Sequence, residues 1–126
     1  MKVAFDIHGS LDSDPKLVKL MESFYNTDVL IYIISGPPIS EILVDLKKLD
    51  IDISRVFPIS IVDYLKSKNY PWEKDNRGYW FDEELWWMSK GLICNEYDID
   101  IIFDDKIEYS KYMPPNTRFI LWRGGF

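Results

Sequence analysis

The fold is indicated first by the stretch Val3-Ala4-Phe5-Asp6-Ile7-His8-Gly9-Ser10, an apolar run that ends in polar residues. Valine, alanine, phenylalanine and isoleucine suit a buried strand, whereas an unpaired buried carboxylate costs several kcal/mol or becomes neutral. Asp6 therefore needs a partner, which a metal ion or a phosphate site would supply. A strand that simply frays into a polar turn, with Gly9 present for its backbone freedom, fits this segment equally well.

Similar apolar runs predict the other strands. They are rich in Ile, Val and Phe with little polar alternation, which is typical of strands buried on both faces. The expected strands cover residues 2–7, 29–34, 99–103 and 118–122, with a weaker one over residues 55–59. Pro58 favours an edge position for the weaker strand, because proline has no backbone N–H to donate.

Helical patterns lie between these strands. The expected caps are Ser13 or Asp14 for a helix from Pro15, and Ser40 for a helix that ends at residue 49. A short third helix is expected over residues 61–68. Strands that alternate with helices predict right-handed crossovers, and so a parallel sheet with helices on both faces.

The region before the fourth strand is less regular. Asp82 can cap a helix with apolar residues at helical spacing up to Ile93, and Gly91 marks a point where it could break or fray. Residues 69–81 fit neither the apolar period of a helix nor that of a strand, and predict an aromatic loop with turns at Pro71 and Gly78. This loop either folds over the core, or offers Trp72, Tyr79 or Trp80 to a substrate ring.

Length and composition predict one domain, residues 1–126, with a core of its own. Fifteen basic and twenty-one acidic residues give a net charge of −6, which argues against a broad nucleic-acid footprint. The one cysteine, Cys94, cannot form an internal disulfide and is expected to be buried and inert. Because no signal peptide and no bilayer-length apolar run are visible, we expect a cytoplasmic protein without a membrane partner.

Polar residues gather where the expected strands end. In an open parallel sheet, ligands bind beyond the carboxyl ends of the strands. The first strand delivers Asp6 and His8, the second ends at Ser35 and Gly36, and the strand over residues 99–103 is followed by Asp104 and Asp105. Lys90 stands on the helix that leads into that strand. Hard oxygen ligands without a thiol favour Mg²⁺ over zinc, although the acidic pair could also begin a solvated turn.

The order of these residues resembles the haloacid dehalogenase superfamily of phosphohydrolases. Its first motif, an apolar strand followed by Asp-x-Asp-Gly and Thr or Ser, is similar to residues 5–10. Its second, a strand that ends in Ser or Thr, is similar to residues 31–36. Its lysine is best matched by Lys90, with Lys74 and Arg77 as alternatives, and its acidic motif by residues 101–105. The resemblance implies a three-layer, Rossmann-like, doubly wound sheet, for which we expect the order 5-4-1-2-3. Family members often carry a cap domain, but residues 9–28 hold little beyond one helix and the segment after residue 69 is too short, so we expect no cap domain.

The resemblance also implies a mechanism. Asp6 would attack phosphorus and bind Mg²⁺ together with the backbone carbonyl of His8. Ser35, beside Gly36, would donate to a phosphoryl oxygen, and Lys90 would neutralise charge that develops during transfer. Asp104 and Asp105 would hold the cation, with Glu108 as an alternative to Asp105.

The chain departs from the family at His8, where a second aspartate usually protonates the leaving group. Histidine can perform this step near neutral pH. We therefore expect a Mg²⁺-dependent phosphatase with an open site for a small phosphate ester, or for a phosphorylated nucleic-acid end. A neighbouring subunit could complete the site. One rival is a phosphate-binding or interaction protein that has lost turnover. Another is a phosphoacceptor receiver domain. In receiver domains an acidic pair follows the first strand, whereas here the pair follows a later strand, which argues against this class.

Overall fold

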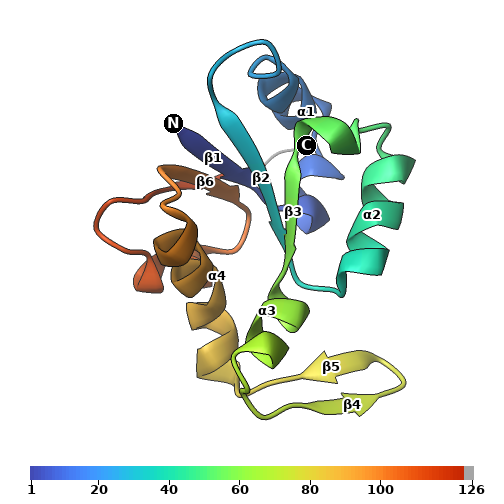
Figure 1. Cartoon of the computed structure of the whole chain (residues 1–126), viewed down its shortest axis with the longest axis vertical. Helices are drawn as coiled ribbons and strands as arrows, with labels where there is room; N and C mark the ends of the chain where they lie inside the picture. The colour runs from blue at the N-terminus through green and yellow to red at the C-terminus, as the bar shows by residue number, and fades with distance from the viewer. Residues whose placement is uncertain (124–126) are drawn as a thin grey trace.

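The computed structural model describes residues 1–123 and has five parallel strands in one sheet (Figure 1). The strands are β1 (Lys2–Phe5), β2 (Leu30–Ser35), β3 (Phe57–Ser60), β6 (Ile101–Asp104) and β7 (Arg118–Leu121). They lie in the order β3-β2-β1-β6-β7. This differs from the expected 5-4-1-2-3 in its numbering, because the strands of an additional hairpin, β4 and β5, precede β6 and β7 in the chain. The edge position expected for the strand with Pro58 is confirmed.

Helices cover both faces of the sheet, as the alternation of strands and helices predicts. The helices are α1 (Pro15–Glu22), α2 (Ile39–Lys48), α3 (Ile61–Ser67) and α4 (Glu83–Tyr97). Val3 and Phe5 of β1 are buried with side chains of α1 and α2, whereas Ala4 between them is buried with side chains of α3 and α4. Successive residues of a strand point to opposite faces, so β1 contributes to two cores at once.

The helix starts depend on side-chain caps at three positions. Asp14 accepts a hydrogen bond from the backbone N–H of Lys16 at 2.9 Å, and Asp82 accepts one from Leu85 at 3.1 Å. These caps confirm the predictions for α1 and α4. Ser60 caps α3. The prediction for α2 is wrong, since this helix begins at Ile39, before Ser40, and has Pro38 at its cap position.

Gly91 does not interrupt α4, which is continuous from Glu83 to Tyr97. A side chain at this position would lie 2.2 Å from the backbone oxygen of Tyr112. Gly91 therefore allows α4 to approach the short helical segment η3 (Ile107–Tyr112) closely. The expected break is wrong because the glycine serves close packing, which helix propensity alone does not reveal.

The first strand ends earlier than expected, at Phe5. The chain then forms the irregular helical turn η1 (Ile7–Leu11), within which His8 and Gly9 have non-helical backbone angles. Gly9 has φ of 84°, a left-handed conformation that favours glycine. Asp6 is therefore the first residue beyond the strand, at the point where the backbone turns across the end of the sheet.

The segment expected to be an aromatic loop contains a β-hairpin. Strands β4 (Glu73–Asp75) and β5 (Gly78–Trp80) pair antiparallel around a tight turn. Asp75 accepts a hydrogen bond from the backbone N–H of Arg77 at 2.8 Å. The rings of Trp72 and Tyr79 lie 5.4 Å apart on one side of the hairpin. In Figure 1 the hairpin projects beyond α3, at the end of the sheet to which β3 points.

Within residues 1–123, no helix combines the length and the apolar character that a membrane crossing requires.

Candidate active site

Three aspartates meet at the carboxyl ends of the two central strands. β1 pairs with β6 so that Phe5 lies opposite Phe103, and the backbone N–H of Asp6 donates to the carbonyl of Phe103 at 3.0 Å. This register brings Asp6 beside Asp104 and Asp105. One carboxylate oxygen from each of the three lies within 4.8 Å of the others. The meeting of the first-strand aspartate with the late acidic pair, expected from the sequence, is therefore present.

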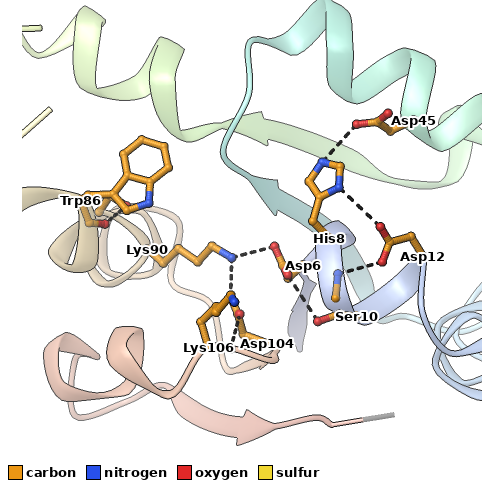
Figure 2. A network of polar contacts seen from close by, with 11 residues as sticks. Asp6, His8, Ser10, Asp12, Asp45, Trp86, Lys90, Asp104 and Lys106 are labelled. Atoms are coloured by element: carbon orange, nitrogen blue, oxygen red, sulfur yellow. Dashed lines mark hydrogen bonds and ion pairs between the residues drawn. The ribbon is translucent and has the colours of Figure 1, made fainter. Parts of the chain in front are cut away.

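Lys90 reaches this cluster from α4. Its ammonium group bonds Asp6 Oδ1 at 2.9 Å and also Asp104 Oδ2, and the side chain is almost completely buried (Figure 2). The ammonium also lies 4.4 Å from the centre of the Tyr109 ring. Burial by itself would lower the pKa of Lys90, but the two carboxylates outweigh it and hold that pKa above its ordinary value. Lys90 is therefore a permanent cation in this site.

The carboxyl group of Asp6 is in an environment that disfavours its charge. Burial raises the pKa of Asp6 to about 6, while Lys90 opposes the rise and Asp104 adds to it. Ser10 Oγ donates to Asp6 Oδ2 at 3.3 Å, and the backbone N–H of Lys106 donates to Asp104 Oδ1 at 2.9 Å. Three neighbouring carboxylates with one ammonium among them carry excess negative charge, which a cation would offset.

Two buried oxygens at this end of the sheet have no hydrogen-bond partner among the described residues. They are Ser35 Oγ, which stands at the end of β2, and Asp105 Oδ1. An unsatisfied buried polar atom costs about 1–3 kcal/mol. Such atoms are rare in folded proteins and commonly mark the place of a ligand, an ion or a water molecule. Both belong to residues for which the sequence predicts ligand or metal binding.

Gly9 leaves space for the side chain of Asp105. A Cβ atom at Gly9 would lie 2.1 Å from Asp105 Oδ2, which is far inside contact distance. The absence of a side chain at Gly9 therefore lets the Asp105 carboxylate pack against the turn after β1. The glycine directly after His8, on the polar rim of the sheet, thus has a spatial role as well as a conformational one.

We predict that Gly9→Ala lowers the free energy of unfolding by about 1–3 kcal/mol, through backbone strain, and displaces Asp105. Chemical denaturation measures this loss. Gly78→Ala is the matched control, because Gly78 also has positive φ, at 134°, but has open space where a Cβ would lie. Both variants should lose stability through backbone strain, and Gly9→Ala should lose more, because its Cβ would also collide with the Asp105 carboxylate. Equal losses in the two variants would contradict this role of Gly9.

The imidazole of His8 does not face the aspartate cluster. Its Nδ1 lies 3.4 Å from Asp12 Oδ2, and its Nε2 lies 3.3 Å from Asp45 Oδ2 of α2. Figure 2 shows the ring turned toward α2, whereas Asp6 points toward Lys90. The side chain is 56% exposed and lines a hollow of about 500 Å³. His8 is therefore accessible to a group that approaches from solvent, but does not touch Asp6.

The structure shows which of the other candidate residues lie at the aspartate cluster. Lys90 joins the cluster, whereas its alternatives Lys74 and Arg77 lie on the hairpin, where they line another hollow. Among the described residues, Glu108 is not part of the three-carboxylate group and is exposed on η3. Gly36 follows the buried Ser35 and lies under Trp86, whose ring would be 3.1 Å from a Cβ at this position.

The carboxylate partners of His8 were not predicted from the sequence. Asp12 stands one helical turn after His8, so its spacing offered a local signal. Asp45 gave no local sequence signal, because it lies on a separate helix. Tyr109, which packs over Lys90, was also missed, since its position depends on how η3 lies against α4. Cys94 is buried as expected, and burial raises its pKa to about 12, which suits an inert thiol.

Comparison of the chain with models of protein families, with curated proteins and with solved structures gives no match.

Proposed function

We propose that this protein is a Mg²⁺-dependent phosphohydrolase that acts on a phosphate monoester, with Asp6 as the nucleophile. The observation that carries this proposal is the group Asp6, Asp104 and Asp105, three carboxylates within 4.8 Å of one another, two of which, Asp6 and Asp104, bond the buried Lys90. A nucleophile, a fixed cation and a metal-binding carboxylate pair are the parts that phosphoryl transfer through an aspartate requires. The resemblance of residues 5–10 and 101–105 to haloacid dehalogenase motifs supports the same activity.

The donor set fits Mg²⁺. This ion prefers oxygen ligands and usually keeps several water molecules, so one to three carboxylates are enough. Asp6, Asp104 and Asp105 would hold it, and the unpartnered Oδ1 of Asp105 is an oxygen that such an ion would satisfy. Bound Mg²⁺ would screen the charge between the aspartates and the substrate phosphate.

The remaining steps use side chains of this chain. A carboxylate oxygen of Asp6 attacks phosphorus, the P–O bond to the leaving group breaks, and an aspartyl phosphate forms. Ser35 Oγ, which is buried without a partner, donates to a phosphoryl oxygen, and Lys90 offsets the charge that develops there. Water then hydrolyses the aspartyl phosphate and releases phosphate. His8, exposed at the rim, donates a proton to the leaving-group oxygen and then accepts one from the attacking water.

The direct test is hydrolysis of p-nitrophenyl phosphate by the purified protein with Mg²⁺ and with a chelator. Turnover should require the metal. We expect Asp105→Asn to weaken Mg²⁺ binding by about tenfold or more, on the scale seen for lost metal-site interactions, as measured by calorimetry. Glu108→Gln, the exposed acid outside the cluster, is the control and should bind Mg²⁺ normally. Equal losses in both variants would reject the assigned ligand set.

A second candidate function is phosphate binding without turnover. It is favoured by one observation, namely that the His8 ring contacts Asp12 and Asp45 instead of facing Asp6. The substitution His8→Asp separates the two candidates. If the native chain hydrolyses the aryl phosphate and His8→Ala slows it by about a hundredfold or more, His8 is the acid or base. If only His8→Asp has activity, the native protein is the non-catalytic form.

A further inference from the structure

A hollow of about 820 Å³ lies between the β4–β5 hairpin and the loop that follows β2. The hairpin contributes Lys74, Asn76, Arg77 and Tyr79 to one wall, and Trp86 of α4 contributes to the other. We call this hollow the hairpin cleft. It is several times larger than a phosphate group needs, so the phosphate chemistry proposed for Asp6 does not account for it.

The hairpin cleft lies next to the candidate active site. Gly36 lines it and directly follows Ser35, whose buried hydroxyl is unpartnered. Trp86 stands four residues before Lys90 in α4, a spacing that puts both on one face of the helix. Figure 2 shows Trp86 beside Lys90 and on the same helix. The cleft also shares Pro37, Ser40 and Glu41 with the smaller hollow that His8 lines.

Both walls of the cleft make contacts with neighbouring side chains. Lys66 of α3 lies 4.2 Å from the centre of the Trp72 ring and 4.4 Å from that of Tyr79, which links the hairpin to α3. On the opposite wall, Trp86 stacks with Phe81 at 6.0 Å between ring centres. Such aromatic and cation contacts favour these positions of the walls without an added ligand.

Both basic and acidic groups line the cleft. Lys74 and Arg77 balance Glu41 and Asp75 there, whereas the chain as a whole has a net charge of −6. Arg77 is 74% exposed, and its guanidinium lies 3.8 Å from Asp75, a loose ion pair, and 5.1 Å from the centre of the Trp80 ring, which does not line the cleft. Exposed contacts of these two kinds contribute little to stability, so the guanidinium can turn to an anionic ligand at little cost. Asn76 adds an amide that can both donate and accept hydrogen bonds.

We propose that the hairpin cleft binds the nucleoside part of a nucleoside phosphate whose ester group lies at Asp6. This inference deepens the proposed function and rests on it for the position of the ester. Tyr79 and Trp86 give the cleft apolar aromatic surface for a base, while Asn76 and Ser40 supply hydrogen bonds to its polar edges. Lys74 and Arg77 suit the ribose hydroxyls or a further phosphate. A free nucleotide and the end of an oligonucleotide share this chemistry.

The test compares ligands that differ only in the base. Binding of the four ribonucleoside 5′-monophosphates and of ribose 5-phosphate is followed by tryptophan fluorescence of the Asp6→Asn protein, which lacks the nucleophile and so prevents turnover, with Mg²⁺ present. At least one nucleotide should bind about tenfold tighter than ribose 5-phosphate, since stacking of one base contributes about this much. Similar affinities for all five compounds would overturn the proposal. A 5′-phosphorylated dinucleotide that binds tighter still would identify an oligonucleotide end as the source.

Variants then locate the binding. Arg77→Ala should weaken nucleotide binding about fivefold or more, because a charge-assisted contact is lost at an exposed position. Tyr79→Ala should weaken it as well. Arg118→Ala, on the exposed edge strand β7, is the matched arginine control. Nucleotide binding that is insensitive to both hairpin variants would also overturn the proposal.

These experiments distinguish failure of the cleft assignment from failure of the proposed phosphatase. If the protein hydrolyses ribose 5-phosphate with Mg²⁺ but shows no preference for a base, the phosphatase is supported and the cleft assignment is rejected. If nucleotides bind in the hairpin cleft and no ester is hydrolysed, the cleft assignment is supported and the phosphatase is rejected.

Discussion

Asp6→Asn should abolish the proposed phosphatase activity, with a fall in turnover of at least about a thousandfold, while the protein remains folded. Removal of a nucleophile that forms a covalent intermediate has effects of this size or larger. The amide of asparagine has nearly the shape of the carboxylate, but cannot attack phosphorus. The measurement is the rate of p-nitrophenyl phosphate hydrolysis with saturating Mg²⁺. Asp28→Asn, the same change at an exposed loop position, should retain full activity.

The same variant has a predictable effect on stability when a chelator is present. Burial raises the pKa of Asp6 to about 6 from an ordinary value of 3.8, so the folded state disfavours the charged form. The wild type therefore loses free energy of unfolding as the pH rises through the interval from about 4 to 6, and this loss is complete above that interval. The amide in Asp6→Asn carries no charge, so the variant should be at least as stable as the wild type at pH 7. A variant that is unfolded at pH 7 would contradict the unfavourable environment assigned to the Asp6 carboxylate.

Retained turnover in the folded Asp6→Asn protein would mean that another group attacks phosphorus. Lys90 would still be paired with Asp104 in that variant, so a disordered lysine could not explain the result. Mass spectrometry of the wild-type protein, quenched during turnover, gives a second readout. An aspartyl phosphate on Asp6 adds the mass of a phosphoryl group to the peptide that contains Asp6.

The sheet was predictable because its strands are short, apolar and nearly uninterrupted. β1, β2 and β6 lie within the ranges expected from these runs, apart from small shifts at their ends. Parallel strands bring their carboxyl ends to one edge, so the meeting of Asp6 with Asp104 and Asp105 followed from topology and not from local sequence. The sequence left Lys74 and Arg77 open as alternatives to Lys90, and of these three the structure brings Lys90 to Asp6.

The parts that the sequence did not predict depend on contacts between distant segments. The hairpin strands are three residues each, too short for a periodic signal, and their position depends on Lys66 of α3 against Trp72 and Tyr79. The orientation of His8 depends on Asp45, which lies on another helix. Gly91 was interpreted as a weak point of a helix, whereas its neighbour Tyr112 comes from a later segment. In each case tertiary packing overrides the local pattern.

Lys90→Met should reduce the free energy of unfolding by about 3–5 kcal/mol, the usual cost of removing one partner from a buried ion pair. Lys90 is 1% exposed and contacts the carboxylates of both Asp6 and Asp104. Without its ammonium group, three acidic side chains are left together in a largely buried site. Chemical denaturation in the presence of a chelator measures the loss. Lys19→Met, a change at an exposed position of α1, is the control and should have little effect.

Mg²⁺ should restore much of this stability, because a divalent cation supplies the positive charge that the variant lacks. The rise in unfolding free energy on addition of saturating Mg²⁺ should therefore be larger for Lys90→Met than for the wild type, as the metal binds the folded state preferentially. Turnover should still be lost, since Lys90 is the group proposed to offset charge on the transferring phosphoryl group. A Lys90→Met protein that gains no more stability from Mg²⁺ than the wild type would show that the metal and Lys90 do not act on the same carboxylates. That result would remove the electrostatic basis for a metal site at Asp6, Asp104 and Asp105.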